Sequence, residues 1–192
     1  MRWLVGNLDR QFRLLLVIPA AVILMLQAQL ALAQDDDYTY AGVDLNYSNL
    51  DALGVTYNPI TLRAKLGVVL LPDIVPLFAF ETQFGVDIAD DTNTINGQPV
   101  SLGINYYVGF YARASYEFAD VASVYGLLGL SAAQLYGNVI LLGDDTETGL
   151  SFGLGATFSL PFDIDGSIEV MQLVNGDYFD IYMASIGASY KF

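Results

Sequence analysis

From Gln34 to its end, the chain alternates apolar side chains with small or polar ones over long stretches. The longest stretch runs from Leu102 to Phe118, where every second residue is apolar or aromatic. A period of two is typical of a β-strand, because successive side chains of a strand point to opposite faces of the sheet. After Gln34 no convincing 3.6-residue apolar period of an amphipathic helix occurs. The sequence therefore predicts an all-β fold.

Eight such runs can be counted, and an even number suits an antiparallel barrel. The expected strands are residues 41–48, 60–70, 78–88, 102–118, 122–136, 150–160, 164–173 and 182–192. The run that begins at Ala122 and ends at Tyr136 is apolar on both sides, which leaves its register open. The connections alternate between tight ones and mostly longer ones, the tight ones being residues 72–76, 119–121 and 161–163. Short turns at one end and longer loops at the other are typical of an outer-membrane barrel.

The distribution of charge between the two faces favours a membrane barrel over a soluble one. All four bases after residue 13 fall on the face with small and polar residues, namely Arg63, Lys65, Arg113 and Lys191. A soluble barrel or sandwich, the alternative, carries its charges on the outside and would leave the opposite apolar face exposed to water. We therefore expect an eight-stranded, antiparallel, up-and-down transmembrane β-barrel whose apolar face meets lipid.

The interior of such a barrel would collect the charged side chains. We expect an interior charge network of Asp44, Arg63, Lys65, Glu81, Arg113, Glu117, Glu169 and Lys191. Arg63 and Lys65 are expected near Glu81, Arg113 near Glu117, and Glu169 near Lys191. One interpretation is a salt-bridge plug that fills the lumen, because buried charges require partners. Two alternatives are a narrow gated ion path and a carboxylate pair for acid–base chemistry.

The first 33 residues have the features of a cleaved signal peptide. Three arginines precede an apolar run from Leu14 to Leu26, and a small-x-small pattern ends at Ala33. The alternative is a retained signal anchor, for which this apolar run is short. We expect the barrel domain to be residues 34–192. Removing the leader takes away three of the seven bases and one of the 21 acids, which leaves a formal charge of −16.

Composition excludes several classes of function. The chain has no cysteine and no histidine, so disulfides, thiolate or histidine metal sites and Ser-His or Cys-His catalysis are excluded. No basic patch is available for nucleic acid. We expect no enzyme, no cofactor and no metal centre. The acids of the longer loops could bind divalent cations, although none has a calcium-loop spacing, and a solvated acidic rim is the simpler interpretation.

Tyrosines lie near several strand ends and could form interfacial girdles. The expected girdle residues are Tyr38, Tyr40, Tyr116, Tyr125, Tyr136 and Tyr190.

With its leader, its alternating strands, the segment of residues 124–129 and the ending Ala188-Ser189-Tyr190-Lys191-Phe192, the chain resembles the small OmpA-like, opacity-type outer-membrane barrels of Gram-negative bacteria. The resemblance implies an outer-membrane location and contact with membrane lipid and lipopolysaccharide. It also implies that the barrel-assembly machinery reads Tyr190 and Phe192. A peptidoglycan-binding domain of larger family members does not follow Phe192 in this sequence.

The function we expect is structural and concerns membrane integrity. The alternatives are a narrow gated channel or small-solute porin, and a surface binding protein that acts through its acidic extracellular loops.

Overall fold

The computed structural model describes residues 38–52, 54–70, 77–95, 97–119, 121–137, 146–176 and 179–192. The predicted signal peptide and the predicted tight turn at residues 72–76 lie outside these ranges. Among the described residues, no helix has the length and apolar character needed to cross a membrane.

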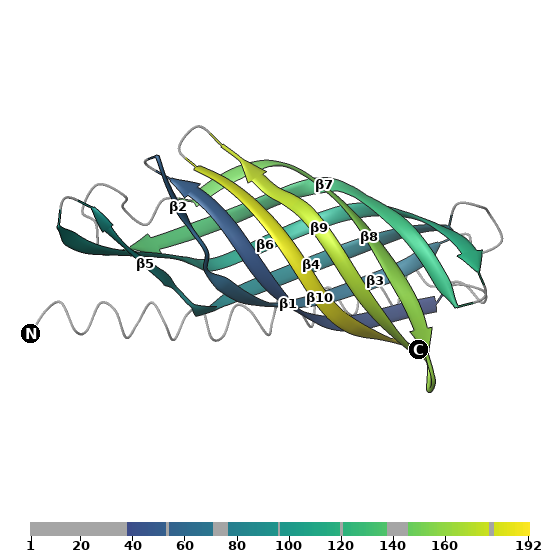
Figure 1. Ribbon diagram of the computed structural model, residues 1–192. Helices are drawn as coiled ribbons and strands as arrows, with labels where there is room; N and C mark the ends of the chain where they lie inside the picture. Colours follow the sequence, from purple (N-terminus) through teal and green to yellow (C-terminus); the bar gives the residue numbers. More distant parts are fainter. Residues whose placement is uncertain are drawn as a thin grey trace, which may run out of the picture. The chain divides into compact units, whose positions relative to one another are not determined.

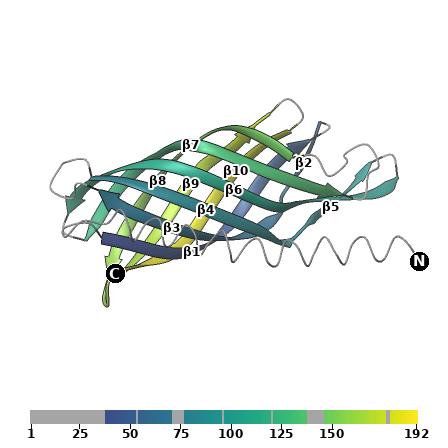
Figure 2. The ribbon, with the colours of Figure 1, turned by 180° about the vertical axis from the view of Figure 1, so that it is seen from behind.

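Ten antiparallel strands form one sheet that closes on itself (Figures 1 and 2). They are β1 (Tyr38–Ala52), β2 (Val55–Tyr57), β3 (Ile60–Leu70), β4 (Leu77–Ala89), β5 (Asp91–Ile95), β6 (Gln98–Ala119), β7 (Ala122–Gly137), β8 (Thr146–Leu160), β9 (Ile164–Asn175) and β10 (Phe179–Lys191). Each strand of the ring pairs with its neighbours in the chain, and β1 pairs with β10 to close it. Eight strands make the ring, as predicted. The short strands β2 and β5 extend hairpins at one end.

The ring has its apolar side chains on the outside and its polar side chains on the inside, which is the reverse of a soluble protein. Leu154, Leu130 and Ile186 are each more than 60% exposed on the outer face. Arg63, Asn46 and Gln83 are fully buried in the lumen. The alternation predicted from the sequence therefore holds, with its apolar side outward, and in β7 it places Tyr125 inside the ring.

Two β-bulges reverse the faces near one end of the barrel. In β6 the register with β7 shifts between Ile104 and Tyr106, so that Asn105 is an extra residue. As a result Leu102 and Ile104, which the uninterrupted alternation placed on the outer face with Phe110, are buried inside. That expectation was wrong because a single inserted residue exchanges inward and outward positions. A matching shift in β9 places Leu173 and Val174 both inside.

The bulges divide the lumen into levels. Beyond them lies an apolar core of buried side chains, which includes Leu50, Tyr57, Leu102, Ile104, Leu135, Leu173, Val174, Phe179 and Ile181. The hairpins of β2 and β5 lie at this end and are joined by a hydrogen bond from Asn93 Nδ2 to the carbonyl of Thr56 (2.9 Å). The middle of the lumen holds the charged side chains. The end with the chain's C-terminus and the short turns is more open.

Candidate functional site

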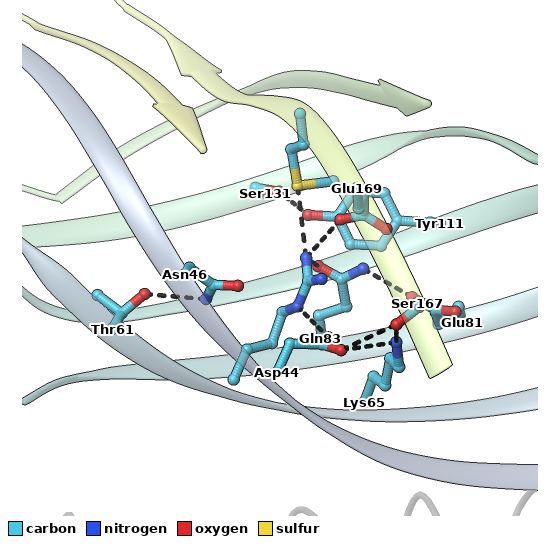
Figure 3. A network of polar contacts seen from close by, with 12 residues as sticks. Asp44, Asn46, Thr61, Lys65, Glu81, Gln83, Tyr111, Ser131, Ser167 and Glu169 are labelled. Carbon is cyan, nitrogen blue, oxygen red and sulfur yellow. Dashed lines mark hydrogen bonds and ion pairs between the residues drawn. The ribbon is translucent and has the colours of Figure 1, made fainter. Parts of the chain in front are cut away.

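Arg63 is the centre of the charged layer. Its Nε donates to Asp44 Oδ2 at 2.7 Å, and its Nη1 donates to Glu169 Oε1 at 2.6 Å and to Gln83 Oε1 at 3.1 Å. These contacts join β3 to β1, β4 and β9 across the lumen (Figure 3). Lys65 completes the group, because its Nζ lies 2.8 Å from Asp44 Oδ1 and 3.1 Å from Ser167 Oγ.

A second group surrounds Arg113 on the side of the open end. Its Nη1 lies 3.3 Å from Glu81 Oε2, and its guanidinium stacks over the ring of Tyr125 at 3.7 Å. The Tyr40 hydroxyl also donates to Glu81. Gln83 connects the two groups, because its Nε2 donates to Glu81 Oε1 at 2.6 Å while its Oε1 accepts from Arg63.

The two groups together are electrically neutral. Three bases, Arg63, Lys65 and Arg113, face three acids, Asp44, Glu81 and Glu169. Removing one member of a buried pair leaves an uncompensated charge and typically costs about 3–5 kcal/mol. The charged layer is therefore stable only when each buried charge keeps a partner of opposite sign.

The ion pairs in the structure differ from the expected ones. Glu81 pairs with Arg113, whereas Arg63 and Lys65 pair with Asp44. The sequence pattern could not reveal this, because it identifies the face of each residue but not the reach of a long side chain across the lumen.

Two of the expected network residues lie outside the charged layer. Glu117, which was expected near Arg113, is exposed near the open end, and Arg113 forms its ion pair with Glu81 instead. Lys191 pairs with Asp165 at 2.8 Å, and not with Glu169 as expected. Asp165 was on the inward face of the predicted strand and is the ion-pair partner that the sequence reasoning missed.

Buried tyrosines fill the lumen around the charges. Tyr40 and Tyr125, expected in the interfacial girdles, are 5% and 3% exposed and point inward, so this prediction was wrong. Each lies directly across from a glycine on the neighbouring strand, as do Tyr107 and Tyr111; the pairs are Tyr40–Gly67, Tyr107–Gly85, Tyr111–Gly129 and Tyr125–Gly155. A Cβ at any of these glycines would overlap the ring. Such cross-strand pairs of glycine with an inward tyrosine are a signal that could have been read from the sequence once the register was known.

A polar vestibule lies between Arg113 and the open end. Hydroxyl side chains, Glu117, and the Lys191–Asp165 pair line it, and water could occupy about 50 Å³ of it. This is room for a few water molecules. Among the described residues, no cluster of three or more acids could hold a metal ion. The acids at 144, 145 and 177, on which a cation site in the loops would partly depend, lie outside the described ranges.

Residues 18–192 match the family model described as "Outer membrane protein beta-barrel domain". The chain belongs to this family. It is therefore a protein of the bacterial outer membrane, as predicted, and its apolar outer face meets lipid. No curated protein matches the chain.

Solved structures similar to the chain include small outer-membrane barrels. Ail of Yersinia pestis, in complex with the heparin analogue sucrose octasulfate, has a TM-score of 0.58 at 16% identity, covering 81% of this chain and 99% of its own. Neisserial surface protein A has a TM-score of 0.57 at 14% identity, covering 80% and 97%. The N-terminal barrel of Pseudomonas aeruginosa OprF has a TM-score of 0.51 at 13% identity, covering 79% and 97%. At these identities the likeness concerns the fold. In barrels of this kind the short turns face the periplasm, so the vestibule opens there and the apolar core lies at the extracellular end.

Proposed function

We propose that the protein is a structural component of the outer membrane, a closed barrel without catalytic activity that contributes to membrane integrity. The observation that carries this proposal is that two successive layers fill the lumen. The first is the neutral ion-pair layer around Arg63, and the second is the apolar core beyond the bulges.

The second layer is the stronger barrier to a solute. An ion that displaced the ion pairs would next meet Ile104, Leu173 and Ile181, which are all fully buried. Moving an unpaired ion into apolar surroundings costs many kcal/mol. An eight-stranded ring is also only wide enough for side chains.

Recordings across a planar lipid bilayer test the closed state. We expect no conductance steps from the purified protein. The double variant Arg63→Met/Glu169→Gln, which removes one base and one acid and keeps the layer neutral, should also stay closed because the apolar core is unchanged. Steady conductance from the native protein would contradict the proposal.

A test in cells addresses the structural role. Deleting the gene should increase entry of a large antibiotic or a detergent through the outer membrane, and the native gene should reverse this. The double variant, if it accumulates in the outer membrane, should restore the barrier equally well. An unchanged barrier in the deletion strain would argue against a role in membrane integrity.

The alternative function as a narrow gated channel is favoured by one observation, the vestibule. This cavity has room for water and reaches Arg113, whose 3.3 Å ion pair with Glu81 is longer than the two ion pairs of Arg63. Conductance that appears only in the double variant would support this alternative, with the charged layer as the gate.

Binding at the cell surface is less well supported. The solved Ail complex contains a sulfated ligand, and a sulfated ligand requires basic side chains. In this chain every base after residue 13 lies on a ring strand, in the lumen or at the periplasmic end.

A further inference from the structure

The turn between β8 and β9 has an unusual backbone for its sequence. It consists of residues 161–163, and both Figures 1 and 2 show it reaching past the C-terminus. Phe162 and Asp163 have φ angles of 69° and 57°. Glycine, asparagine and aspartate are the residues that tolerate this left-handed region, whereas a bulky aromatic residue is strained there. Phe162 is thus the exceptional residue of the turn.

The hairpin holds this backbone in place, because Leu160 pairs with Ile164 across the turn. The side chain of Phe162 is not held in the same way. The side chain of Phe162 is 86% exposed, more than any other large apolar side chain among the described residues. A strained backbone persists where the surrounding structure holds it in place, and such positions often mark functional sites. The hairpin accounts for the backbone of Phe162, but not for an exposed phenylalanine at a position that glycine or asparagine would fit better.

The position of Phe162 relative to the lipid-facing band indicates what lies outside. On β8 the outward column runs from Leu150 to Leu160, and ten steps of about 3.4 Å at a tilt of about 40° span about 26 Å. The apolar band of such barrels is about 25 Å tall, so Leu160 lies at its periplasmic edge. Phe162 follows two residues later, at the level of the lipid headgroups.

Neighbouring groups continue the same apolar edge. The Lys191 amide donates to the Asp163 carbonyl at 3.0 Å, which ties the turn to the end of β10. There Tyr190 and Phe192 are about half exposed and stack with ring centroids 6.2 Å apart. The turn is therefore continuous with the lipid-facing surface.

We propose that Phe162 inserts into the headgroup boundary of the periplasmic leaflet and anchors the barrel at a fixed depth in the membrane. The occupant of this site is phospholipid, because the side chain extends an uninterrupted lipid-facing column. Phenylalanine, tryptophan and leucine are the side chains that membrane-surface segments bury at the boundary between headgroups and acyl chains.

Tryptophan fluorescence tests this directly, because the sequence contains a single tryptophan, Trp3. In a Trp3→Phe background of the full chain, Phe162→Trp places the only reporter at the turn. Two matched probes bracket it: Leu154→Trp on the lipid-facing wall and Thr94→Trp on the extracellular hairpin. Purified protein is reconstituted into phosphatidylcholine vesicles with spin-labelled lipids, and acrylamide serves as the aqueous quencher.

We expect the Phe162→Trp reporter to be quenched most by lipids labelled near the headgroup, and Leu154→Trp by lipids labelled deep in the chains. Acrylamide should quench Phe162→Trp several-fold less than Thr94→Trp. Full acrylamide access with no lipid quenching would overturn the proposal. If that access were lost in native outer-membrane fragments, a periplasmic protein and not lipid would be the partner.

A second variant tests whether the anchor outweighs the strain. Asparagine suits the left-handed turn better than phenylalanine, so Phe162→Asn would stabilise a turn that touches nothing. We expect the opposite in phosphatidylcholine vesicles, namely a lower urea midpoint for unfolding, with Phe162→Leu closer to native. A raised midpoint for Phe162→Asn would also overturn the proposal.

Discussion

At the scale of the residue, Arg63 is the side chain that holds the charged layer of the lumen together. It is fully buried and pairs with acids on two strands, Asp44 and Glu169. Asp44 keeps Lys65 as a partner when Arg63 is removed, but Glu169 keeps no base at ion-pair distance. Loss of Arg63 should therefore destabilise the barrel mainly by leaving the carboxylate of Glu169 unpaired.

Replacing Arg63 by methionine should lower the free energy of unfolding by about 3–5 kcal/mol, because it leaves a buried charge unpaired. Adding Glu169→Gln should recover a large part of that loss. Urea unfolding in lipid vesicles measures both. Lys191→Met is the matched control, since its pair with Asp165 is partly exposed and should contribute at most about 1 kcal/mol. Equal losses for Arg63→Met and Lys191→Met would show that the buried layer has no special role.

The tyrosine–glycine pairs give a second prediction at this scale. In Gly85→Ala the new methyl group would overlap the ring of Tyr107, so we expect a loss of about 1–3 kcal/mol from overpacking. Gly126→Ala is the control on the outer face, where the nearest atom to the new Cβ is 3.8 Å away. Thermal unfolding followed by circular dichroism should separate the two, and a destabilised Gly126→Ala with a native-like Gly85→Ala would refute this account.

At the scale of the element, the bulge in β6 determines which residues face the lumen. Asn105 is the extra residue, and its side chain donates to Gln134 at 2.9 Å. Counting back from Tyr107 without Asn105, strict alternation already places Ile104 and Leu102 inside. Deleting Asn105 therefore removes the bulge without exchanging the two faces.

We predict that the Asn105 deletion still folds, whereas deletion of Val108 does not, because the latter moves the inward residues before it to the lipid face. Folding is measured as a heat-dependent shift in SDS gel mobility of the outer-membrane fraction. If both deletion variants fold, or if neither does, the bulge does not determine which residues of β6 face the lumen.

Strand patterns predicted most of the fold but not the bulges. The eight strands, their outward apolar faces and the inward position of Arg63 follow from a period of two. The inward positions of Leu102 and Val174 do not, since one inserted residue has no signature in an apolar run. Likewise the expected Glu169–Lys191 pair failed because the lumen is narrow enough for Arg63 to reach β9 from β3. Pairing across a lumen depends on strand register and tilt, which a sequence pattern does not contain.

At the scale of the whole molecule, every basic residue after residue 13 lies on the barrel wall. After residue 13 the only sites for trypsin are Arg63, Lys65, Arg113 and Lys191, all on β3, β6 or β10. The folded protein should therefore resist trypsin at all positions except near its last residue, and boiling should abolish this resistance. Mass spectrometry of the digest checks the prediction, and cleavage at Arg113 in the unheated protein would contradict a closed ring.

The contact between Arg63 and Glu169 joins residues that are 106 positions apart. It can form only after the last strands have come round to meet the first, because contacts of long sequence separation wait for the chain between them. Until that moment the carboxylate of Glu169 has no base beside it and has to stay in water. A barrel that has not closed therefore carries an unpaired carboxylate at Glu169. Closing the ring and neutralising the charges in the lumen happen at the same time.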